Sequence, residues 1–187
     1  KNLGRAGKLI QSFKQVSSDQ SSEMGRVFNL KKYLEEILLS MHPQLKKSNH
    51  KITLTCHEKL TLNGFPGAFS QVVSNLIMNS VIHAYDPGDE GNITISLNVQ
   101  DRHILLLYTD DGKGMPPHVV AKIFDPFFTT KRGHGGTGLG LHIVYNIVTQ
   151  QFKGTIRCES QPEVGTTFQI RLPLLKEDLF IETGTAN

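Results

Sequence analysis

Apolar residues recur every three or four positions in several parts of this chain, the spacing that places them on one face of an α-helix. The spacing predicts helices over residues 1–18, 30–45, 67–85 and 138–152. A shorter helix is predicted at 116–124, where proline stands at the start. Asn29 is a candidate N-cap for the helix at 30–45, and Pro43 is expected to bend or end it.

Apolar and polar residues alternate in six shorter stretches, which predicts strands. These stretches are 51–56, 60–64, 92–99, 103–109, 154–160 and 166–174. We expect 92–99 to pair with 103–109, and 154–160 to pair with 166–174 around a turn at 161–165. Helices interleaved with hairpins predict an α+β fold, a two-layer α/β sandwich whose mixed, mostly antiparallel sheet carries its helices on one face.

The pattern also divides the chain into three parts. Leu3, Ala6, Ile10 and Phe13 form one apolar stripe on an otherwise polar N-terminal helical arm, and residues 17–25 are polar and end in glycine. A lone helix of this length is marginal in water, so the stripe is expected to need a partner. We therefore expect an arm and connector at 1–25, one domain at 26–175, and a polar tail at 176–187.

Composition adds mainly exclusions. A net charge of +3 spread over 187 residues does not predict a nucleic-acid partner, and no apolar run approaches the roughly 20 residues that cross a bilayer. We accordingly expect no membrane contact within this chain. The two cysteines, Cys56 and Cys158, alternate with polar neighbours, which favours buried thiols in a reducing compartment over a disulfide or a metal pair.

The helix predicted at 67–85 has a polar row without any charge. Gln71, Asn75, Asn79 and His83 recur every four positions, and the segment contains no Lys, Arg, Asp or Glu. Buried amides need partners, because an unmet one costs about 1–3 kcal/mol. The row either bonds neighbouring backbone, or it binds a ligand: an Asn oxygen can hold hydrated Mg²⁺, and a histidine can contact phosphate or a base.

An acidic turn follows the strand at 103–109. Asp110-Asp111-Gly112-Lys113-Gly114 is compatible with an ordinary turn, since Asp-Gly pairs are common there. A carboxylate at a strand end can also accept a hydrogen bond from an exocyclic amine. Both interpretations stay open on this stretch alone.

The stretch FDPFFTTKRGHGGTGLGLHIV, residues 124–144, sets three phenylalanines before a dense run of glycines. Phe124, Phe127 and Phe128 could anchor one end of a mobile segment to the core. The glycines lead into a helix start, where free N–H groups bind phosphate, and Lys131 and Arg132 stand just upstream. The alternative is a flexible surface loop with an apolar base.

Taken together, NLIMNSVIH, DDGKGM, FDPFFTTK…GGTGLGL and GTTF occur in the order typical of one family. Over residues 27–175 the chain resembles the ATP-binding domain of sensor histidine kinases of two-component systems, which has the Bergerat fold; there these stretches are called the N, G1, F and G2 boxes. The first 25 residues resemble the end of that family's dimerisation and phosphoacceptor hairpin.

The resemblance implies a role for each matching position. Asn79 corresponds to the Mg²⁺-binding Asn, Asn75 to its companion, and Asp110 to the acceptor for the adenine amine, with 125–137 as the ATP lid. Ile82 stands where many members carry a phosphate-binding Lys, so we look to His83, Lys131 or Arg132 for that contact. Asn79, His83 and Lys131 are thus the expected catalytic residues. The expected nucleotide contacts are Asn75, Asn79, His83, Asp110, Gly112, Gly114, Lys131, Arg132, Gly136, Thr137, Gly138, Leu139 and Gly140.

The resemblance also separates a kinase from its relatives. Gyrase-, Hsp90- and MutL-like ATPases, and anti-sigma-type kinases, carry a Glu where this chain has Asn75, which cannot act as a general base. A non-catalytic nucleotide-sensing module is the alternative from another class, and a GHKL-type ATPase is a further one. The intact G1 Asp and G2 glycines favour the kinase.

No histidine occurs among the first 41 residues, and His57 lies between two predicted strands. The phosphoacceptor His and any sensor domain are therefore expected upstream of Lys1. We expect this chain to bind ATP and Mg²⁺ without phosphorylating itself, in a cytoplasmic part of the parent protein. The expected partners are a second copy, through the helical hairpin, and a response regulator.

Overall fold

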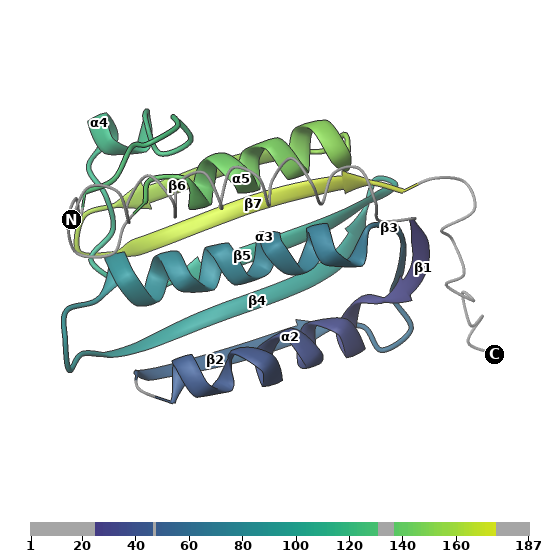
Figure 1. The fold of residues 1–187 in the computed structure, drawn as a ribbon, viewed down its shortest axis with the longest axis horizontal. Coiled ribbons are helices and arrows are strands. Elements are labelled where there is room, and N and C mark those ends of the chain that lie inside the picture. Colours follow the sequence, from purple (N-terminus) through teal and green to yellow (C-terminus); the bar gives the residue numbers. More distant parts are fainter. Residues whose placement is uncertain (1–24, 47, 131–136, 175–187) are drawn as a thin grey trace, which may run out of the picture.

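The computed structural model of the protein describes residues 25–46, 48–130 and 137–174. Several features predicted from the sequence lie outside the described residues: the helical arm and most of the connector at 1–24, Lys131, Arg132, Gly136, and the tail at 176–187. The described part contains the whole predicted sandwich (Figure 1).

Five strands form one twisted sheet in the order β2-β4-β5-β7-β6. Their bounds are β2 Asn49–Cys56, β4 Glu90–Gln100, β5 His103–Asp110, β6 Thr155–Gln161 and β7 Gly165–Pro173. β2 pairs with β4 in parallel, and every other pairing in the sheet is antiparallel. The predicted mixed, mostly antiparallel sheet is confirmed, as are both predicted hairpins, β4–β5 and β6–β7.

A separate two-stranded ribbon joins β1 (Arg26–Asn29) to β3 (Thr61–Gly64). The strand at β3 was predicted, but β1 was not. Only Phe28 of β1 is buried, so these four residues show no alternation that a sequence pattern could reveal.

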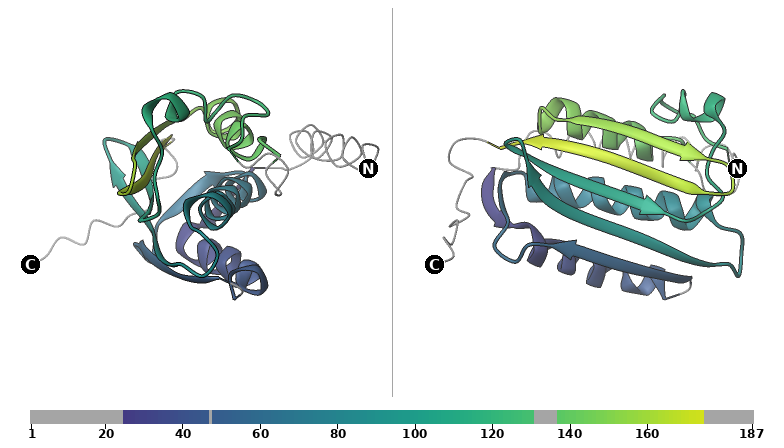
Figure 2. Two further views of the ribbon diagram at one scale, coloured as in Figure 1. Left: turned by 90° about the vertical axis from the view of Figure 1, so that its left-hand side faces the viewer. Right: turned by 180° about the vertical axis from the view of Figure 1, so that it is seen from behind.

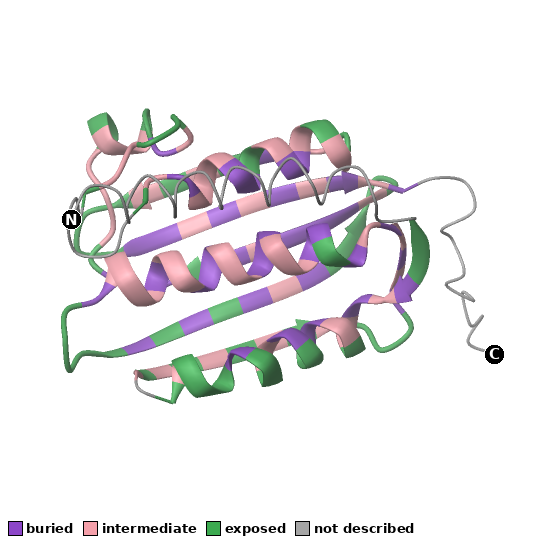
Figure 3. Cartoon of the chain, viewed as in Figure 1, coloured by how far each residue is buried: buried purple, intermediate pink, exposed green. Residues whose placement is uncertain are grey.

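Three helices cover one face of the sheet, as predicted (Figure 2). They are α2 (Leu30–Leu45), α3 (Pro66–Asn79) and α5 (Gly140–Asn146). The strand residues that face these helices are buried: Ile104, Leu106 and Tyr108 of β5 are each at most 1% exposed. Along β4, buried residues alternate with exposed ones, because successive side chains of a strand point to opposite faces (Figure 3).

Helix α2 begins as the sequence predicts. The side-chain oxygen of Asn29 accepts a hydrogen bond from the backbone N–H of Lys32 at 2.9 Å. Pro43 lies inside the last turn, and the helix continues only to Leu45. Proline is tolerated there because little helix follows it.

Helices α3 and α5 both change from α-helical to π-helical geometry at their C-terminal ends. α3 passes directly into a π-helical turn, η1 (Ser80–Ala84), and α5 passes into a second one, η2 (Ile147–Gln151). The predicted helix at 116–124 is shorter than expected: α4 covers only Pro117–Val120. π-Helical turns are uncommon and often occur at functional sites.

The two thiols are free, and they are half-buried rather than fully buried as expected. Cys56 ends β2 and Cys158 lies in β6, the two opposite edge strands of the sheet. They therefore cannot form a disulfide or share a metal ion. Burial raises the pKa of Cys56 to about 11 and that of Cys158 to about 12, so both stay protonated at neutral pH.

Candidate functional site

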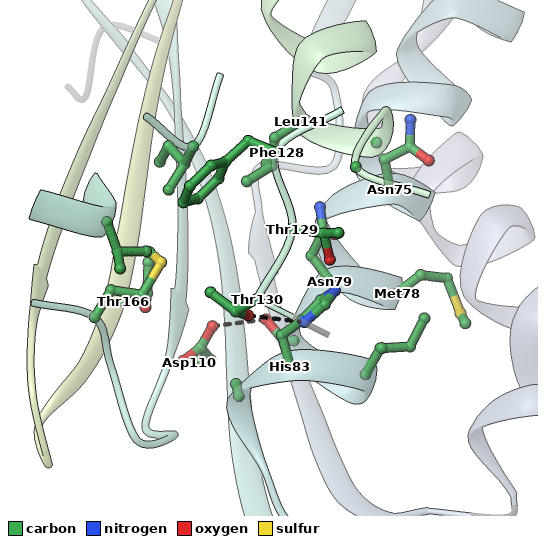
Figure 4. A pocket seen from close by; sticks show the side chains of 18 of the residues that line it. Asn75, Met78, Asn79, His83, Asp110, Phe128, Thr129, Thr130, Leu141 and Thr166 are labelled. Carbon is green, nitrogen blue, oxygen red and sulfur yellow. Dashed lines mark hydrogen bonds between the residues drawn. The ribbon is translucent and has the colours of Figure 1, made fainter. Parts of the chain in front are cut away.

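A cavity of about 320 Å³ opens at the end of the sheet where β5 stops and β7 starts. Its walls come from the C-terminal part of α3, from η1, from the segment 113–130 and from the start of α5. Figure 4 shows side chains from these elements around the opening. Four stretches of the chain, within 75–84, 110–130, 137–141 and 166–168, therefore build one site.

Asn75 and Asn79 line the cavity from α3, one helical turn apart. The side-chain Nδ2 atom of each is buried, and it has no hydrogen-bond partner among the described residues. A buried unmet amide costs about 1–3 kcal/mol. Asn79 also faces α5, since a Cβ added at Gly140 would lie 3.5 Å from its amide. Two unsatisfied amides at one cavity wall indicate a polar ligand.

His83 extends the same row from η1. Its Nδ1 lies 3.5 Å from the hydroxyl Oγ1 of Thr130, across the cavity (Figure 4). In an α-helix, residues four apart drift slowly around the axis. The helix becomes π-helical from Ser80 onward, and Asn79 and His83 both line the cavity.

Asp110 lies on the opposite wall, at the end of β5, and it is 3% exposed. Its Oδ2 accepts a hydrogen bond from the Ser80 hydroxyl at 2.6 Å, and its Oδ1 accepts one from the Gly112 backbone N–H at 3.2 Å. Burial raises the pKa of the Asp110 carboxyl, although these bonds and one from the Thr166 backbone oppose the rise. Asp110 is the one carboxylate of the described chain that lines the cavity.

Asp111 points away from the cavity and serves the turn. Its carboxylate accepts hydrogen bonds from the Asn92 backbone N–H and side chain, both at 2.7 Å, and from the Tyr85 hydroxyl at 2.9 Å. Burial opposes ionisation, but these donors outweigh it and hold the pKa of Asp111 below its usual range. Asp111 therefore has the ordinary turn role, whereas the other interpretation, an acceptor for an exocyclic amine, stays a prediction for Asp110.

Two glycines at the cavity have a left-handed backbone and close neighbours. Gly114 has φ +62°, and a Cβ there would lie 1.9 Å from the Gln161 carbonyl oxygen. Gly138 has φ +70°, and a Cβ there would lie 2.5 Å from the Phe127 carbonyl carbon. No other residue fits either position without backbone movement.

The phenylalanines before the glycine run divide into two groups. Phe124 packs against the rings of Tyr145 and Phe168, and Phe128 is half-buried and lines the cavity, so both act as anchors. The prediction was wrong for Phe127, which is 51% exposed and has φ +64°. Its backbone, rather than its ring, makes the close contact, because Gly138 packs against it.

The structure brings most of the predicted site residues to this cavity. Its lining includes Asn75, Asn79, His83, Asp110, Gly114, Thr137, Gly138 and Gly140. Gly112 lies behind Asp110, packed against Ala84, and Leu139 belongs to the hydrophobic core instead. Lys131, Arg132 and Gly136 lie outside the described residues. Ile82 lines the cavity with an apolar side chain. This position therefore provides no positive charge, as expected from the replacement of the Lys that many family members carry.

Several residues of the site were not predicted from the sequence. Ser80 and Thr166 are buried polar residues at the cavity, and Met115, Ile123 and Leu141 supply apolar wall. Thr166 lies within the GTTF motif, which could have pointed to it. The apolar residues have the same spacing as core residues, so no sequence pattern distinguishes them.

Comparison with known proteins identifies the family. Residues 65–176 match the family described as histidine kinase-, DNA gyrase B-, and HSP90-like ATPases. Sporulation kinase A of Bacillus subtilis is 31% identical over 173 residues, which cover 91% of this chain and 27% of that protein. Sensor kinase CckA of Brucella abortus is 41% identical over 128 residues, covering 60% of this chain and 13% of that protein. The chain thus spans about a quarter or less of these relatives.

Solved structures agree with the sequence relatives. The catalytic domain of histidine kinase ThkA, in a nucleotide-free form, superposes with a TM-score of 0.71 at 28% identity. The match covers 83% of this chain and 99% of that one. No described helix is long and apolar enough to cross a membrane. The chain therefore belongs to the family of histidine kinase-, DNA gyrase B- and HSP90-like ATPases, and it is the ATP-binding catalytic domain of a sensor histidine kinase of a two-component system.

Proposed function

We propose that this domain holds Mg·ATP so that the γ-phosphoryl group is transferred to the imidazole of a histidine outside this chain, for relay to a response regulator. One observation carries the proposal: an unsatisfied amide row on α3 faces a buried carboxylate on β5 across one cavity. Such transfers depend on positioning and charge neutralisation more than on covalent chemistry by the protein. The cavity offers groups for both.

The two walls have different tasks. On β5, Asp110 accepts a hydrogen bond from the adenine amine. On α3, Asn79 is the Mg²⁺ ligand and Asn75 supports it from one turn earlier. The unmet buried amides fit this role, because an amide oxygen is a ligand that Mg²⁺ accepts, and the N and O atoms of an amide can exchange places by a flip. When bound, Mg²⁺ neutralises charge that develops on the phosphates.

The phosphates need further positive partners, since Ile82 supplies none. His83 faces the cavity beside Thr130, and Lys131 follows Thr130 directly in sequence, with Arg132 next. The backbone N–H groups of residues 136–140, including those of Gly136, Gly138 and Gly140, are the remaining candidates for phosphate contacts.

Hydrolysis is disfavoured by the same wall. A water-activating base would be needed one turn before Asn79, and Asn75 occupies that place. The one described carboxylate at the cavity, Asp110, already binds Ser80 and Gly112. A phosphoryl acceptor other than water fits this arrangement better.

The partners follow from the reaction. A structure of histidine kinase ThkA in complex with the response regulator protein TrrA has a TM-score of 0.73 to this chain, at 23% identity. By analogy we propose a response regulator as the next acceptor, and a dimer formed through a helical hairpin in the longer protein. We propose that this part of the protein lies in the cytoplasm, where ATP is available.

Calorimetric titration with ATP and Mg²⁺ tests the proposal. We expect micromolar, Mg²⁺-sensitive binding, weakened about 5- to 150-fold in Asp110→Asn, which corresponds to about 1–3 kcal/mol for a mismatched partner of the amine. Alanine substitution of His83, Lys131 and Arg132 in turn identifies the phosphate contact; unchanged affinity in all three would exclude them.

Two further outcomes distinguish the alternatives. Rapid phosphate release by the chain alone would favour an ATPase, and stable label at one of its own histidines would place the acceptor inside the chain. Binding without transfer to any histidine-bearing hairpin of the longer protein would favour a nucleotide-sensing module. Absence of ATP binding would contradict the proposal outright.

A further inference from the structure

Three buried polar side chains form a continuous row of hydrogen bonds that runs from the core to the cavity wall. The Tyr108 hydroxyl donates to Ser80 Oγ at 2.8 Å, and Ser80 Oγ donates to Asp110 Oδ2 at 2.6 Å. Tyr108 is 0% exposed, and Ser80 and Asp110 are each 3% exposed. The row joins the sheet to η1, since Tyr108 and Asp110 belong to β5 and Ser80 to η1.

The protons in this row have only one arrangement when Asp110 is ionised. A carboxylate only accepts hydrogen bonds, so the single proton of Ser80 must point to Asp110. The contact between Tyr108 and Ser80 then requires that Tyr108 be the donor. The row therefore starts at a phenol and ends at a carboxylate.

This arrangement restrains both Ser80 and the carboxylate. A serine in a helix can turn its hydroxyl toward a carbonyl one turn earlier, which would leave Asp110 Oδ2 without its donor. The Tyr108 hydroxyl opposes that rotation, because it would lose its own partner in a buried site. Oδ2 is thus held by Ser80, and Oδ1 accepts the longer 3.2 Å bond from Gly112 N–H. The Thr166 backbone also donates to this carboxylate, and because an ionised carboxylate has about four acceptor sites, it retains capacity for one further donor.

We propose that Tyr108 and Ser80 are positioning residues that fix the Asp110 carboxylate as a hydrogen-bond acceptor toward the cavity, and so set the preference for a purine that carries an amine. Ser80 borders the cavity and Tyr108 does not, but in this arrangement the hydroxyls of both act through Asp110. The inference rests on the proposed role of Asp110 as partner of the adenine amine.

The test compares two nucleotides that differ only in that amine. ATP and purine riboside 5′-triphosphate, which lacks the exocyclic amine, are titrated with Mg²⁺ into wild type, Ser80→Ala and Tyr108→Phe. We expect Ser80→Ala to weaken ATP binding about 5- to 20-fold and Tyr108→Phe about 2- to 5-fold, as for loss of one bond at a charged group. Binding of the amine-free analogue should change less than twofold. The double variant should resemble Ser80→Ala, because Tyr108 acts through Ser80.

Tyr85→Phe is the matched control. Tyr85 is also buried and its hydroxyl also donates a hydrogen bond, but to the Asp111 carboxylate instead of to Ser80. In the Tyr85→Phe variant, the ratio of the affinity for ATP to the affinity for the amine-free analogue should equal that of wild type. Tyr108→Phe keeps the ring that packs near Phe168, at a centroid distance of 6.3 Å, so the core of this variant is retained.

Asp110→Asn separates failure of this inference from failure of the proposed function. If Asp110→Asn weakens both nucleotides equally, or neither, Asp110 is not the partner of the amine. If Asp110→Asn is selective for ATP but Ser80→Ala and Tyr108→Phe weaken both nucleotides alike, or neither, the positioning role is overturned. Selective loss of ATP in all three variants, with Tyr85→Phe unchanged, supports it.

Discussion

The adjacent carboxyl groups of Asp110 and Asp111, at the end of β5, differ in the protonation state that the fold favours. Burial raises the pKa of Asp110, whereas hydrogen bonds from Asn92 and Tyr85 hold that of Asp111 below its usual range in spite of some burial. The charged form of Asp110 is thus kept in the fold at a cost in stability, whereas Asp111 stabilises the turn beside it. Strain of this kind is common at binding sites.

This difference predicts that Asp110→Asn and Asp111→Asn, two isosteric substitutions, change the melting temperature of the nucleotide-free domain in opposite directions. A raised folded-state pKa means that Asp110 contributes stability only when protonated, and this contribution is lost as pH rises through the folded pKa. At pH 7 the charged form is a cost, so Asp110→Asn should raise the melting temperature relative to wild type. The gain should shrink as pH falls through the folded pKa of Asp110.

Asp111→Asn is the matched variant, with the opposite sign. A lowered folded-state pKa gives stability that is present above the unfolded pKa and is lost as pH falls through the folded one. Asp111→Asn should therefore lower the melting temperature at pH 7. Thermal unfolding of the three proteins at pH 7, without nucleotide, measures the sign of each effect, and a series at lower pH follows how each effect declines. The same sign for both variants would refute the assignment.

Part of this contrast could be predicted from the sequence. Because strand side chains alternate, Asp110 shares a face with Tyr108 and Leu106, which the apolar pattern assigns to the core. That Ser80 would meet Asp110 could not be predicted, because it depends on how η1 docks against the end of β5, thirty residues away in sequence.

At the scale of elements, α2 packs on the core of the domain and lies away from the cavity. None of its residues lines the cavity, and it contributes Leu30, Leu34 and Ile37 to the core. Its N-terminus is tied twice by Asn29, which accepts from the Lys32 N–H and donates to the Glu58 carbonyl oxygen at 2.6 Å.

We expect Asn29→Ala to lower the free energy of unfolding by about 1 kcal/mol, the usual cost of losing an N-cap, within a range of about 0.5–2. Affinity for ATP should stay within twofold of wild type. Urea unfolding and calorimetry measure the two quantities. Asn29→Asp keeps the acceptor for Lys32 and should recover most of the stability; an aspartate variant no better than the alanine variant would contradict the capping role.

Elements were predicted well where one face is buried along their whole length. Strands β4, β5 and β7 alternate regularly, and α2 and α3 keep their apolar stripes. The π-helical turns were not predictable, because the apolar spacing of η1 is compatible with an ordinary α-helix. The short strand β1 depends on pairing with β3, a contact that no local pattern contains.

At the scale of the whole molecule, the site is a property of the assembled fold. Its lining runs from Asn75 to Phe168, so the cavity requires the sheet, two helices and the segment between them together. A ligand that binds only this folded form must stabilise the domain by mass action.

We expect free ATP with Mg²⁺ at 100 times its dissociation constant to add about 2.7 kcal/mol of stability. For a domain of this size, that corresponds to a rise in melting temperature of roughly 5–10 °C. Asp110→Asn at the same nucleotide concentration should show a smaller rise, and Mg²⁺ alone should show little. Equal shifts in wild type and Asp110→Asn would mean that the stabilising nucleotide binds elsewhere.

Most polar residues of the site, apart from Ser80 and Thr166, were predicted from the sequence, and the apolar ones were not. Amides, carboxylate and glycines occur in motifs whose chemistry is specific. Met115, Ile123 and Leu141 are ordinary apolar residues until the fold leaves them beside a cavity.

The parallel pairing of β2 with β4 has a consequence for how this chain is made. Cys56, the last residue of β2, meets its partner Leu97 only after β3, α3 and η1 have been synthesised between them. The hairpins β4–β5 and β6–β7 need no such delay, because their strands follow one another closely. As the ribosome releases the chain, β2 waits with an unpaired edge while α3, which carries Asn75 and Asn79, emerges behind it. Slow decoding between β2 and β4 should therefore lower the yield of soluble protein, whereas the same pause after β4 should be harmless.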